Sequence, residues 1–136
     1  MSASIEDTLI VVKPDAVKRG LVGEILRRFE AKGFTIKRLH MLTLSKSQAE
    51  LFYAVHSDKP FYGELVSFIS SGPVAGAVLS GRDAVETVRR MVGATKSWEA
   101  AAGTIRGDLG LGLTDNAIHA SDSAESFAKE QKAFFG

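Results

Sequence analysis

The chain has 136 residues, with 17 basic and 16 acidic side chains and no cysteine. The balanced charge argues against a protein that coats nucleic acid, and the lack of cysteine excludes disulfide scaffolds, thiol nucleophiles and cysteine-based zinc sites. There is no secretory signal and no apolar stretch of membrane-spanning length. We therefore expect a single domain over residues 1–136, without a membrane or nucleic-acid partner and located in the cytoplasm.

The first third of the chain alternates an apolar run, a helical pattern and a second apolar run. Residues 8–13 are short, apolar and β-branched, which predicts a buried strand that a proline ends. Residues 22–33 have helical spacing and end in glycine, a common helix terminator. Residues 34–44 predict a strand, and the shift in its apolar phase near Lys37 and Arg38 indicates a bulge.

Two further helices are predicted in the middle of the chain. Ser45 and Gln48 fit a capping box that starts the first, and the run Ser71-Gly72-Pro73 ends the second. The inner face of the first is expected to hold Ala49, Phe52 and Val55. The inner face of the second is expected to hold Phe61, Leu65, Phe68 and Ile69.

The last part of the chain returns to strand and helix patterns around a long irregular stretch. Residues 74–79 are almost continuously apolar, which predicts a strand covered on both faces. A helix capped by Asp83 follows, with Val85, Val88, Met91 and Val92 inward. Residues 94–115 show no clear period, and such long loops are often functional. A short strand over residues 116–120 and a helix over residues 124–135 complete a βαββαβ order, with helices on one face of an antiparallel sheet.

His119 lies at the end of the predicted last strand, before the hydroxyl-rich and acidic residues 121–123. Helix N-termini favour anions, and neutral imidazole attacks phosphorus without a separate base. These properties favour His119 as a nucleophile that carries a phosphoryl group. The alternative is a hydrogen-bonded core histidine without a chemical role. The three histidines are far apart and form no H-E-x-x-H motif, so we expect no dedicated zinc site.

Glu130 borders the apolar stripe of the last predicted helix. From there its carboxylate is expected to bond His119 and orient the ring, as the third member of a catalytic triad does. The alternative is a solvated helix residue. Ser121 and Ser123 are candidates for helix caps, and Ser121 is able to support the histidine as well.

Several other residues fit an anion site. Arg89 and Arg106 carry planar guanidinium groups that match phosphate oxygens, although most arginines are solvated surface residues. Lys13 closes a buried strand and needs an anion, a hydroxyl or solvent nearby. Tyr53 and Phe61 flank a polar loop, where aromatic residues pack in the core or stack on bases. These residues together indicate an anion-binding α/β domain.

Six ordered segments resemble the nucleoside diphosphate kinase family, and the match covers essentially the whole chain. Together they are far more specific than any one of them. They are Val12-Lys13-Pro14-Asp15-Ala16-Val17, Arg19-Gly20-Leu21-Val22-Gly23-Glu24-Ile25, the stretch 53–61, Ser71-Gly72-Pro73-Val74, Gly103-Thr104-Ile105-Arg106-Gly107-Asp108 and the stretch 116–123.

The resemblance implies a ferredoxin-like fold and transfer of a γ-phosphate from a nucleoside triphosphate to a nucleoside diphosphate. It further implies a phosphohistidine at His119, ping-pong order, broad base specificity and Mg²⁺ carried by the nucleotide phosphates. The residues it assigns to the nucleotide are Lys13 and Asn116 for the ribose, Phe61, Leu65 and Leu113 for the base, and Arg89, Thr95 and Arg106 for the phosphates. Those it assigns to the support of His119 are Tyr53, Ser121 and Glu130.

The chain departs from the family pattern mainly in the loop over residues 95–113. Prolines common there are absent, since Thr95 is followed by Lys96-Ser97-Trp98, and Ala102 precedes Gly103. Leu109 stands where an aromatic residue is common, and Ala120 where a glycine is. A C-terminal extension found in longer members is also expected to be absent. We expect a homo-oligomer, a hexamer rather than a tetramer or dimer, with loop contacts weakened and Trp98 as an anchor.

Two other functions compete with this one. A catalytically silent nucleotide-binding module with the same fold is disfavoured because His119, Glu130, Lys13 and both arginines are present. A single-stranded RNA binder on a similar sheet needs a basic surface and exposed aromatic residues in mid-strand, neither of which the sequence indicates.

Overall fold

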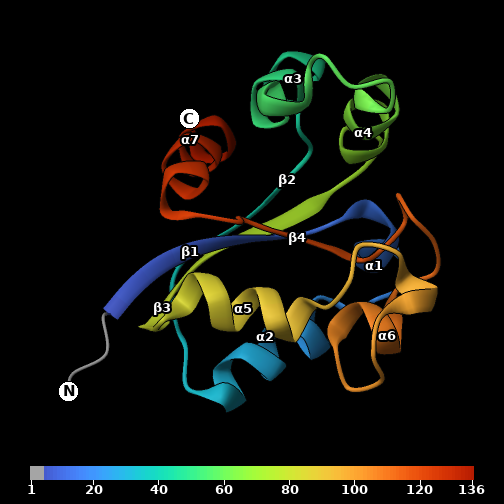
Figure 1. The fold of residues 1–136 in the computed structure, drawn as a ribbon. Coiled ribbons are helices and arrows are strands. Elements are labelled where there is room, and N and C mark those ends of the chain that lie inside the picture. Colours follow the sequence, from blue (N-terminus) through green and yellow to red (C-terminus); the bar gives the residue numbers. More distant parts are fainter. Residues whose placement is uncertain (1–4) are drawn as a thin grey trace.

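The structure, a computed structural model, describes residues 5–136 and contains one four-stranded sheet with helices around it (Figure 1). Within these residues, none of the helices has the length and apolar character that a membrane crossing requires. The elements in chain order are β1 (Ile5–Val12), α1 (Pro14–Lys18), α2 (Val22–Lys32), β2 (Thr35–Leu42), α3 (Lys46–Phe52), the 3₁₀ turn η1 (Ala54–His56), α4 (Tyr62–Ile69), β3 (Val74–Arg82), α5 (Ala84–Val92), the 3₁₀ turn η2 (Ser97–Glu99), α6 (Ile105–Leu109), β4 (Ile118–Ala120) and α7 (Ala124–Phe135).

The sheet is antiparallel throughout, with the spatial order β2-β3-β1-β4. Because side chains alternate across a strand, the central strands feed two separate cores. Leu9 and Val11 of β1 lie in one core, and Ile10 and Val12 lie in the other. Helices α2 and α5 cover one face, as expected, whereas α3, α4 and α7 form a second layer on the opposite face (Figure 1).

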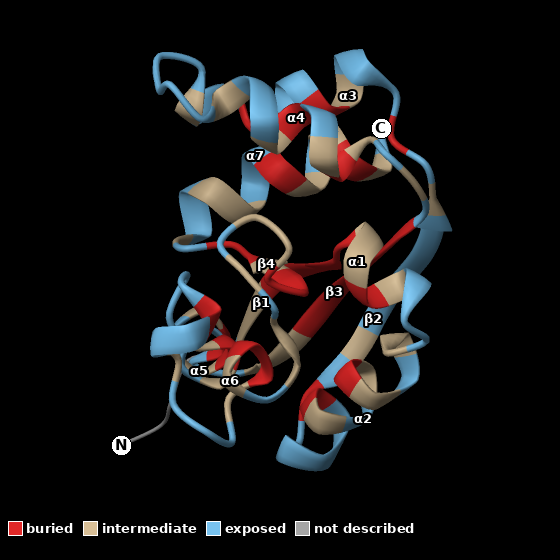
Figure 2. Ribbon diagram, turned by 90° about the vertical axis from the view of Figure 1, so that its right-hand side faces the viewer, coloured by how far each residue is buried: buried red, intermediate tan, exposed pale blue. Residues whose placement is uncertain are grey.

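Burial explains why the third strand reads as an unbroken apolar run. Residues 74–79 of β3 are all buried, since helices cover both sides of the strand (Figure 2). The outward faces of α2 and α3, by contrast, are largely exposed. The predicted strand that is covered on both faces is therefore confirmed.

Local signals predicted several boundaries correctly. Ser45 and Gln48 form the capping box of α3, with both reciprocal hydrogen bonds present. Gly33 ends α2 in the left-handed conformation, at φ 111°. The register of β2 against β3 shifts between Ile36 and Arg38, which is the predicted bulge.

Four expectations were wrong in detail. Val55 lies in η1 and is exposed, because the chain leaves the helical path before that residue. Helix α4 begins after Phe61 and buries Val66 and Ile69 most deeply, while Phe61 is largely exposed. Asp83 precedes α5 but makes no side-chain capping bond. The irregular stretch over residues 94–115 contains η2 and α6. Pro14 follows the end of the first strand, as expected, and also begins the short helix α1.

Candidate active site

The candidate site lies along β4, at an edge of the sheet, where both helical layers meet. Register pairs place Ile118, His119 and Ala120 opposite Val12, Val11 and Ile10 of β1. The side chains of Ile118 and Ala120 enter the α2/α5 core, and strand alternation turns His119 toward α3 and α7. The strand thus presents its histidine to one layer and its backbone carbonyls to helices of the other.

His119 is held by a carboxylate from α7. Its Nε2 lies 2.7 Å from Glu130 Oε1, and Ser121 Oγ donates to the same oxygen at 2.8 Å. A carboxylate only accepts, so in neutral imidazole this contact puts the proton on Nε2 and leaves the lone pair on Nδ1. Glu130 and Ser121 are buried, so the solvated reading of Glu130 is wrong. The helix cap is Ser123, which accepts from the Ser126 N–H, and Ser121 is free for Glu130.

Two aromatic rings complete the surroundings of the imidazole. Tyr53 and Phe52, at the end of α3, meet the ring nearly edge to face at centroid distances of 5.9 and 4.9 Å. Burial lowers the pKa of His119 below its ordinary value, and the hydrogen bond to Glu130 only partly opposes this. The histidine is thereby kept neutral, and its side chain retains 17% exposure. A neutral, oriented and still accessible imidazole is suited to nucleophilic attack.

Lys13 and Asn116 form a second buried group beside β4. The Lys13 Nζ donates to Asn116 Oδ1 at 2.9 Å and to the Thr114 carbonyl at 3.2 Å. Asn116 Nδ2 in turn donates to the carbonyls of Thr95 and Leu113 at 3.0 and 2.9 Å. Desolvation lowers the pKa of Lys13 to about 8. A lysine in this setting gains from a polar or anionic ligand, because its charge is largely removed from water.

Two arginines bracket the histidine from the other layer. Arg106 of α6 donates to the Ile118 carbonyl at 2.7 Å and to the Gly93 carbonyl at 3.2 Å, while Arg89 of α5 donates to the Ala120 carbonyl at 3.2 Å. Burial first, and the charge of Arg89 second, lower the pKa of Arg106 to about 10. Neither arginine forms a salt bridge within residues 5–136. Buried Arg106 also leaves its Nε–H without a hydrogen-bond partner in that range. Arg89 is exposed, and its charge helps to lower the pKa of the Asp122 carboxyl. Buried Arg106, with its unsatisfied Nε–H, is the group that favours an anionic ligand.

The residues expected around a nucleotide base lie farther out. Thr114 Oγ1 donates to Glu64 Oε1 at 3.1 Å, which brings α4 against the loop that carries Leu113. A hollow of about 450 Å³ lies between these segments. Phe61 and Leu113 are 44% and 52% exposed, and Thr95 is exposed as well. Leu65 is half-buried against the α3/α4/α7 core.

The described residues provide no ready-made metal centre. Within residues 5–136, no group of three or more histidine, cysteine, aspartate or glutamate side chains is placed to hold a metal ion. Glu130 is already engaged by His119 and Ser121, and Asp122 Oδ1 accepts from Ser126 Oγ at 2.6 Å. A cation at this site would therefore depend on ligands that come with the substrate.

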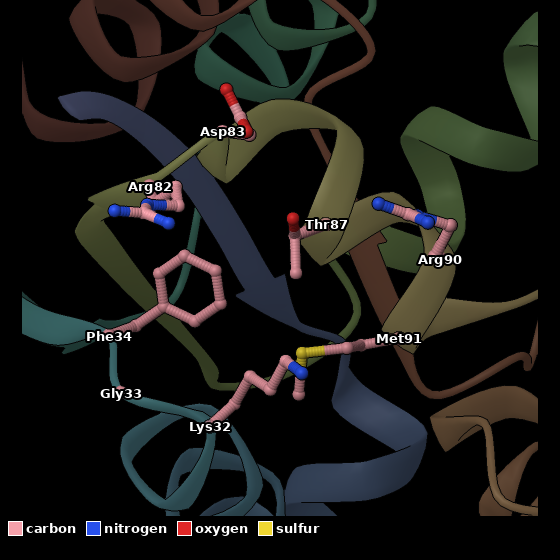
Figure 3. A pocket seen from close by; sticks show the side chains of 8 residues that line it. All are labelled: Lys32, Gly33, Phe34, Arg82, Asp83, Thr87, Arg90 and Met91. Atoms are coloured by element: carbon pink, nitrogen blue, oxygen red, sulfur yellow. The ribbon is translucent and has the colours of Figure 1, made fainter. Parts of the chain in front are cut away.

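A different hollow, of about 510 Å³, lies on the side of the molecule formed by α2, α5 and the end of β3 (Figure 3). Phe34 and Met91 form its floor, and Lys32, Arg82 and Arg90 lie around it. In Figure 3 the two arginines lie on opposite sides of the floor, and Arg82 points away from Arg90. Because ligand sites need convergent polar groups, this hollow does not compete with the site at β4.

Sequence reasoning missed two contributors to the site at β4. Phe52 was expected only in the core, yet its ring also packs on His119. Asp15 was noted only within a motif, yet its carboxylate accepts from the Ala117 N–H at 3.0 Å. The signal for Phe52 was its position next to Tyr53. No local pattern pointed to Asp15, because its partner is 102 residues away.

Comparisons with known proteins agree on one family. The family model described as "Nucleoside diphosphate kinase" matches residues 6–136. A nucleoside diphosphate kinase of Hyperthermus butylicus is 53% identical over 131 residues, which covers 96% of this chain and 92% of that relative. The solved nucleoside diphosphate kinase of Aquifex aeolicus is similar with TM-score 0.95 and 48% identity, covering 98% of this chain and 96% of that one. A halophilic nucleoside diphosphate kinase from Halobacterium salinarum, solved in complex with CDP, is similar with TM-score 0.92 and 45% identity, covering 97% of this chain and 88% of that one.

Proposed function

Given that the chain belongs to the nucleoside diphosphate kinase family and is such a phosphotransferase, we propose that it works by ping-pong transfer through a phosphohistidine on His119. The observation that carries the proposal is the contact between His119 Nε2 and buried Glu130, with Nδ1 left to react. Lys13 and Arg106 are buried, form no salt bridge within residues 5–136 and are close enough for their charges to act on His119, which supports a phosphate site beside that nitrogen.

In the first half-reaction, Nδ1 of His119 attacks the γ-phosphorus of a nucleoside triphosphate. A P–N bond forms, the P–O bond to the β-phosphate breaks, and the nucleoside diphosphate leaves with that electron pair. The imidazole gains positive charge as it becomes phosphorylated, and Glu130 stabilises this charge through Nε2–H. In the second half-reaction, a β-phosphate oxygen of another nucleoside diphosphate attacks phosphorus, and the P–N bond breaks.

Positioning and charge neutralisation account for most catalysis of phosphoryl transfer. Arg106 and Arg89 are proposed to hold the phosphate oxygens together with Thr95, and Lys13 and Asn116 to hold the ribose hydroxyls. Tyr53 packs against the imidazole and limits its rotation, while Ser121 holds the carboxylate. Mg²⁺ is expected to travel on the nucleotide phosphates, because the side chains of residues 5–136 offer no group of three or more metal ligands. It would neutralise phosphate charge there.

The base is proposed to stack on Phe61, with Leu65 and Leu113 at the sides of its slot. CDP in the Halobacterium structure shows that a relative with this fold binds a nucleoside diphosphate. Stacking is blind to base edges, so the enzyme is proposed to accept purine and pyrimidine nucleotides, both ribo and deoxyribo, with modest discrimination. A preference of about four orders of magnitude for one base would require a polar readout and would contradict this view.

A homo-oligomer is proposed, with a hexamer favoured over a tetramer or dimer. Trp98 and Leu111, on the loop over residues 95–113, are 65% and 62% exposed. The exposure of Trp98 supports its indole as an interface anchor rather than a side chain packed on its own subunit.

Incubation of the pure protein with γ-labelled ATP tests the mechanism directly. We expect an acid-labile, base-stable phosphoprotein that passes its label to GDP when the diphosphate is added. The matched control is His119→Ala, which should take up no label while still binding nucleotide. Nucleotide binding by the parent without any labelled protein would instead support the silent binding module.

A further inference from the structure

Ala117, between Asn116 and the strand that carries His119, has a strained backbone. Its φ is 74°, and within residues 5–136 only one other non-glycine residue, Asp83, has a positive φ. The Ile118 N–H donates to the Asn116 carbonyl at 2.9 Å, which closes a γ-turn around Ala117. A γ-turn of this hand is rare and persists only where the surroundings enforce it.

Both polar groups of Ala117 are held by the segment Lys13-Pro14-Asp15. The Lys13 backbone N–H donates to the Ala117 carbonyl at 2.9 Å, and Asp15 Oδ2 accepts from the Ala117 N–H at 3.0 Å. Pro14 lies between them, so Lys13 is extended, with ψ at 164°, and Asp15 enters the first turn of α1. Two bonds from one rigid segment therefore clamp one strained residue.

The turn lies at the junction of the two halves of the site. On one side is Asn116, whose amide binds Lys13 and two loop carbonyls. On the other side the pairing of β4 with β1 begins at once, at Ile118 opposite Val12, and His119 follows. A change of φ at Ala117 would therefore alter the position of His119 relative to Asn116.

Asp15 is not explained by stability alone. Its Oδ1 is buried without a hydrogen-bond partner, and its carboxylate forms no salt bridge, among residues 5–136. Burial raises the pKa of Asp15, with the bond from Ala117 as the main opposing effect. With the folded pKa above the unfolded one, the contribution of Asp15 to stability is lost as pH rises through the folded value. A buried carboxylate whose pKa is raised by burial is typical of a group kept for function.

We propose that Asp15 is a positioning residue for phosphoryl transfer: its carboxylate holds the γ-turn at Ala117 and so sets the position of His119 relative to Asn116. This inference rests on the proposed function of His119. It assigns Asp15 no contact with the substrate.

The test combines Asp15→Ala with Ala117→Gly. Asp15→Ala removes the acceptor, and we expect kcat to fall about 100-fold, the size of effect that a misplacement near 1 Å produces. Glycine adopts positive φ freely, so the turn no longer needs the carboxylate. In the Ala117→Gly background, Asp15→Ala should therefore lower kcat by about tenfold or less, compared with about 100-fold in the parent background. Asp15→Asn keeps a neutral acceptor of the same shape, and we expect it to fold normally and to lose about tenfold.

A second readout reports on the turn itself. Amide hydrogen exchange at Ala117 should be fastest in Asp15→Ala and intermediate in Asp15→Asn. The control Asp7→Ala, which breaks a surface pair with Lys37, should leave both exchange at Ala117 and kcat unchanged. A kcat of Asp15→Ala within threefold of the parent would overturn the inference, and so would unchanged protection of Ala117 or no rescue by glycine. Because exchange does not depend on phosphorylation, a wrong role for His119 would appear separately, as a parent without a phosphoenzyme.

Discussion

Five polar residues are buried around His119, namely Lys13, Arg106, Asn116, Ser121 and Glu130. The residues proposed to meet the base are half-buried or exposed. We call the first group, with His119 and including Lys13 and Asn116 that are proposed to hold the ribose, the phosphate half, and the second, Phe61, Leu65 and Leu113, the base half. The phosphate half is linked by hydrogen bonds of 2.7 to 3.2 Å to residues far along the chain. In the base half the Leu113 carbonyl accepts from Asn116 Nδ2, while the three apolar side chains form no hydrogen bonds. On the proposed assignment, the fold would hold the reacting groups in advance and give the base few specific contacts.

This difference matches the broad base specificity proposed above. Reacting atoms need fixed geometry, because a small misplacement strongly lowers the rate of the chemical step. Bases differ in their hydrogen-bonding edges but share a π-face, so an exposed aromatic ring serves all of them. Substitutions in the phosphate half should therefore change kcat strongly, and those in the base half should change affinity moderately.

The largest effect is expected from His119→Ala. Removal of the nucleophile should lower phosphotransfer by about three orders of magnitude or more. Nucleotide affinity should stay within about threefold of the parent, since the imidazole adds little to ground-state binding. Coupled-assay kinetics and equilibrium dialysis measure the two quantities. Transfer within tenfold of the parent rate would mean that another residue carries the phosphoryl group.

Glu130→Gln should have the next largest effect, a loss of about 100-fold in kcat, because an amide no longer enforces the Nε2-protonated tautomer. Glu130 raises the pKa of His119 against burial, so its neutralisation should lower that pKa further. The parent should lose activity as pH falls through the His119 pKa, since imidazolium is not a nucleophile. The acidic limb of the pH–rate profile should therefore move to lower pH in the variant.

Ser121→Ala is the matched control for this substitution. It removes one bond to the same carboxylate oxygen but keeps the charge. We expect a loss of about tenfold or less. A Glu130→Gln profile that shifts to higher pH, or a loss no greater than that of Ser121→Ala, would contradict the role given to the carboxylate.

Phe61→Ala tests the base half. Loss of one stacking contact should weaken nucleotide binding by about tenfold, to a similar extent for all common bases, with kcat at saturation little changed. Leu51→Ala, at an exposed apolar position on α3, is the control and should leave binding as it is. A loss confined to one base, or one seen mainly in kcat, would show that Phe61 reads identity or positions the phosphate.

Trp98→Ala should have the smallest effect on chemistry. The indole is exposed on the loop over residues 95–113, and its loss should weaken self-association by about tenfold or more while kcat changes by less than about twofold. The loop contains no proline that would lower the entropy of the unfolded chain. Its order should therefore depend on subunit contacts, and the thermal midpoint of the variant should fall along with its assembly. Sedimentation velocity over a concentration series measures this, with Trp98→Phe as the control. A monomeric parent, or an unchanged assembly in the alanine variant, would refute the anchor.

The elements that the sequence predicted well depend on neighbours along the chain. The capping box at Ser45 and Gln48, the glycine that ends α2 and the bulge in β2 all arise from residues within a few positions of one another. Val55 and Phe61 were misassigned because helical spacing continues past the point where the backbone turns away. The helix α6 was missed because its cap, Thr104, follows a glycine and begins only five residues of helix.

By itself, the sequence determined the order of strands and helices, the covered third strand and the candidate histidine, since periodicity and residue chemistry are local properties. The assignment of phosphate and ribose ligands followed only from the family resemblance. Only the tertiary structure decided which polar residues are buried together. The helical pattern left open whether Glu130 is solvated or bonds His119, and Asp15 stood only within a motif, yet both bind partners distant in the chain. Hydrogen bonds that join positions 11 to 103 residues apart depend on how β4 pairs with β1 and how α7 packs, and no local pattern encodes that geometry.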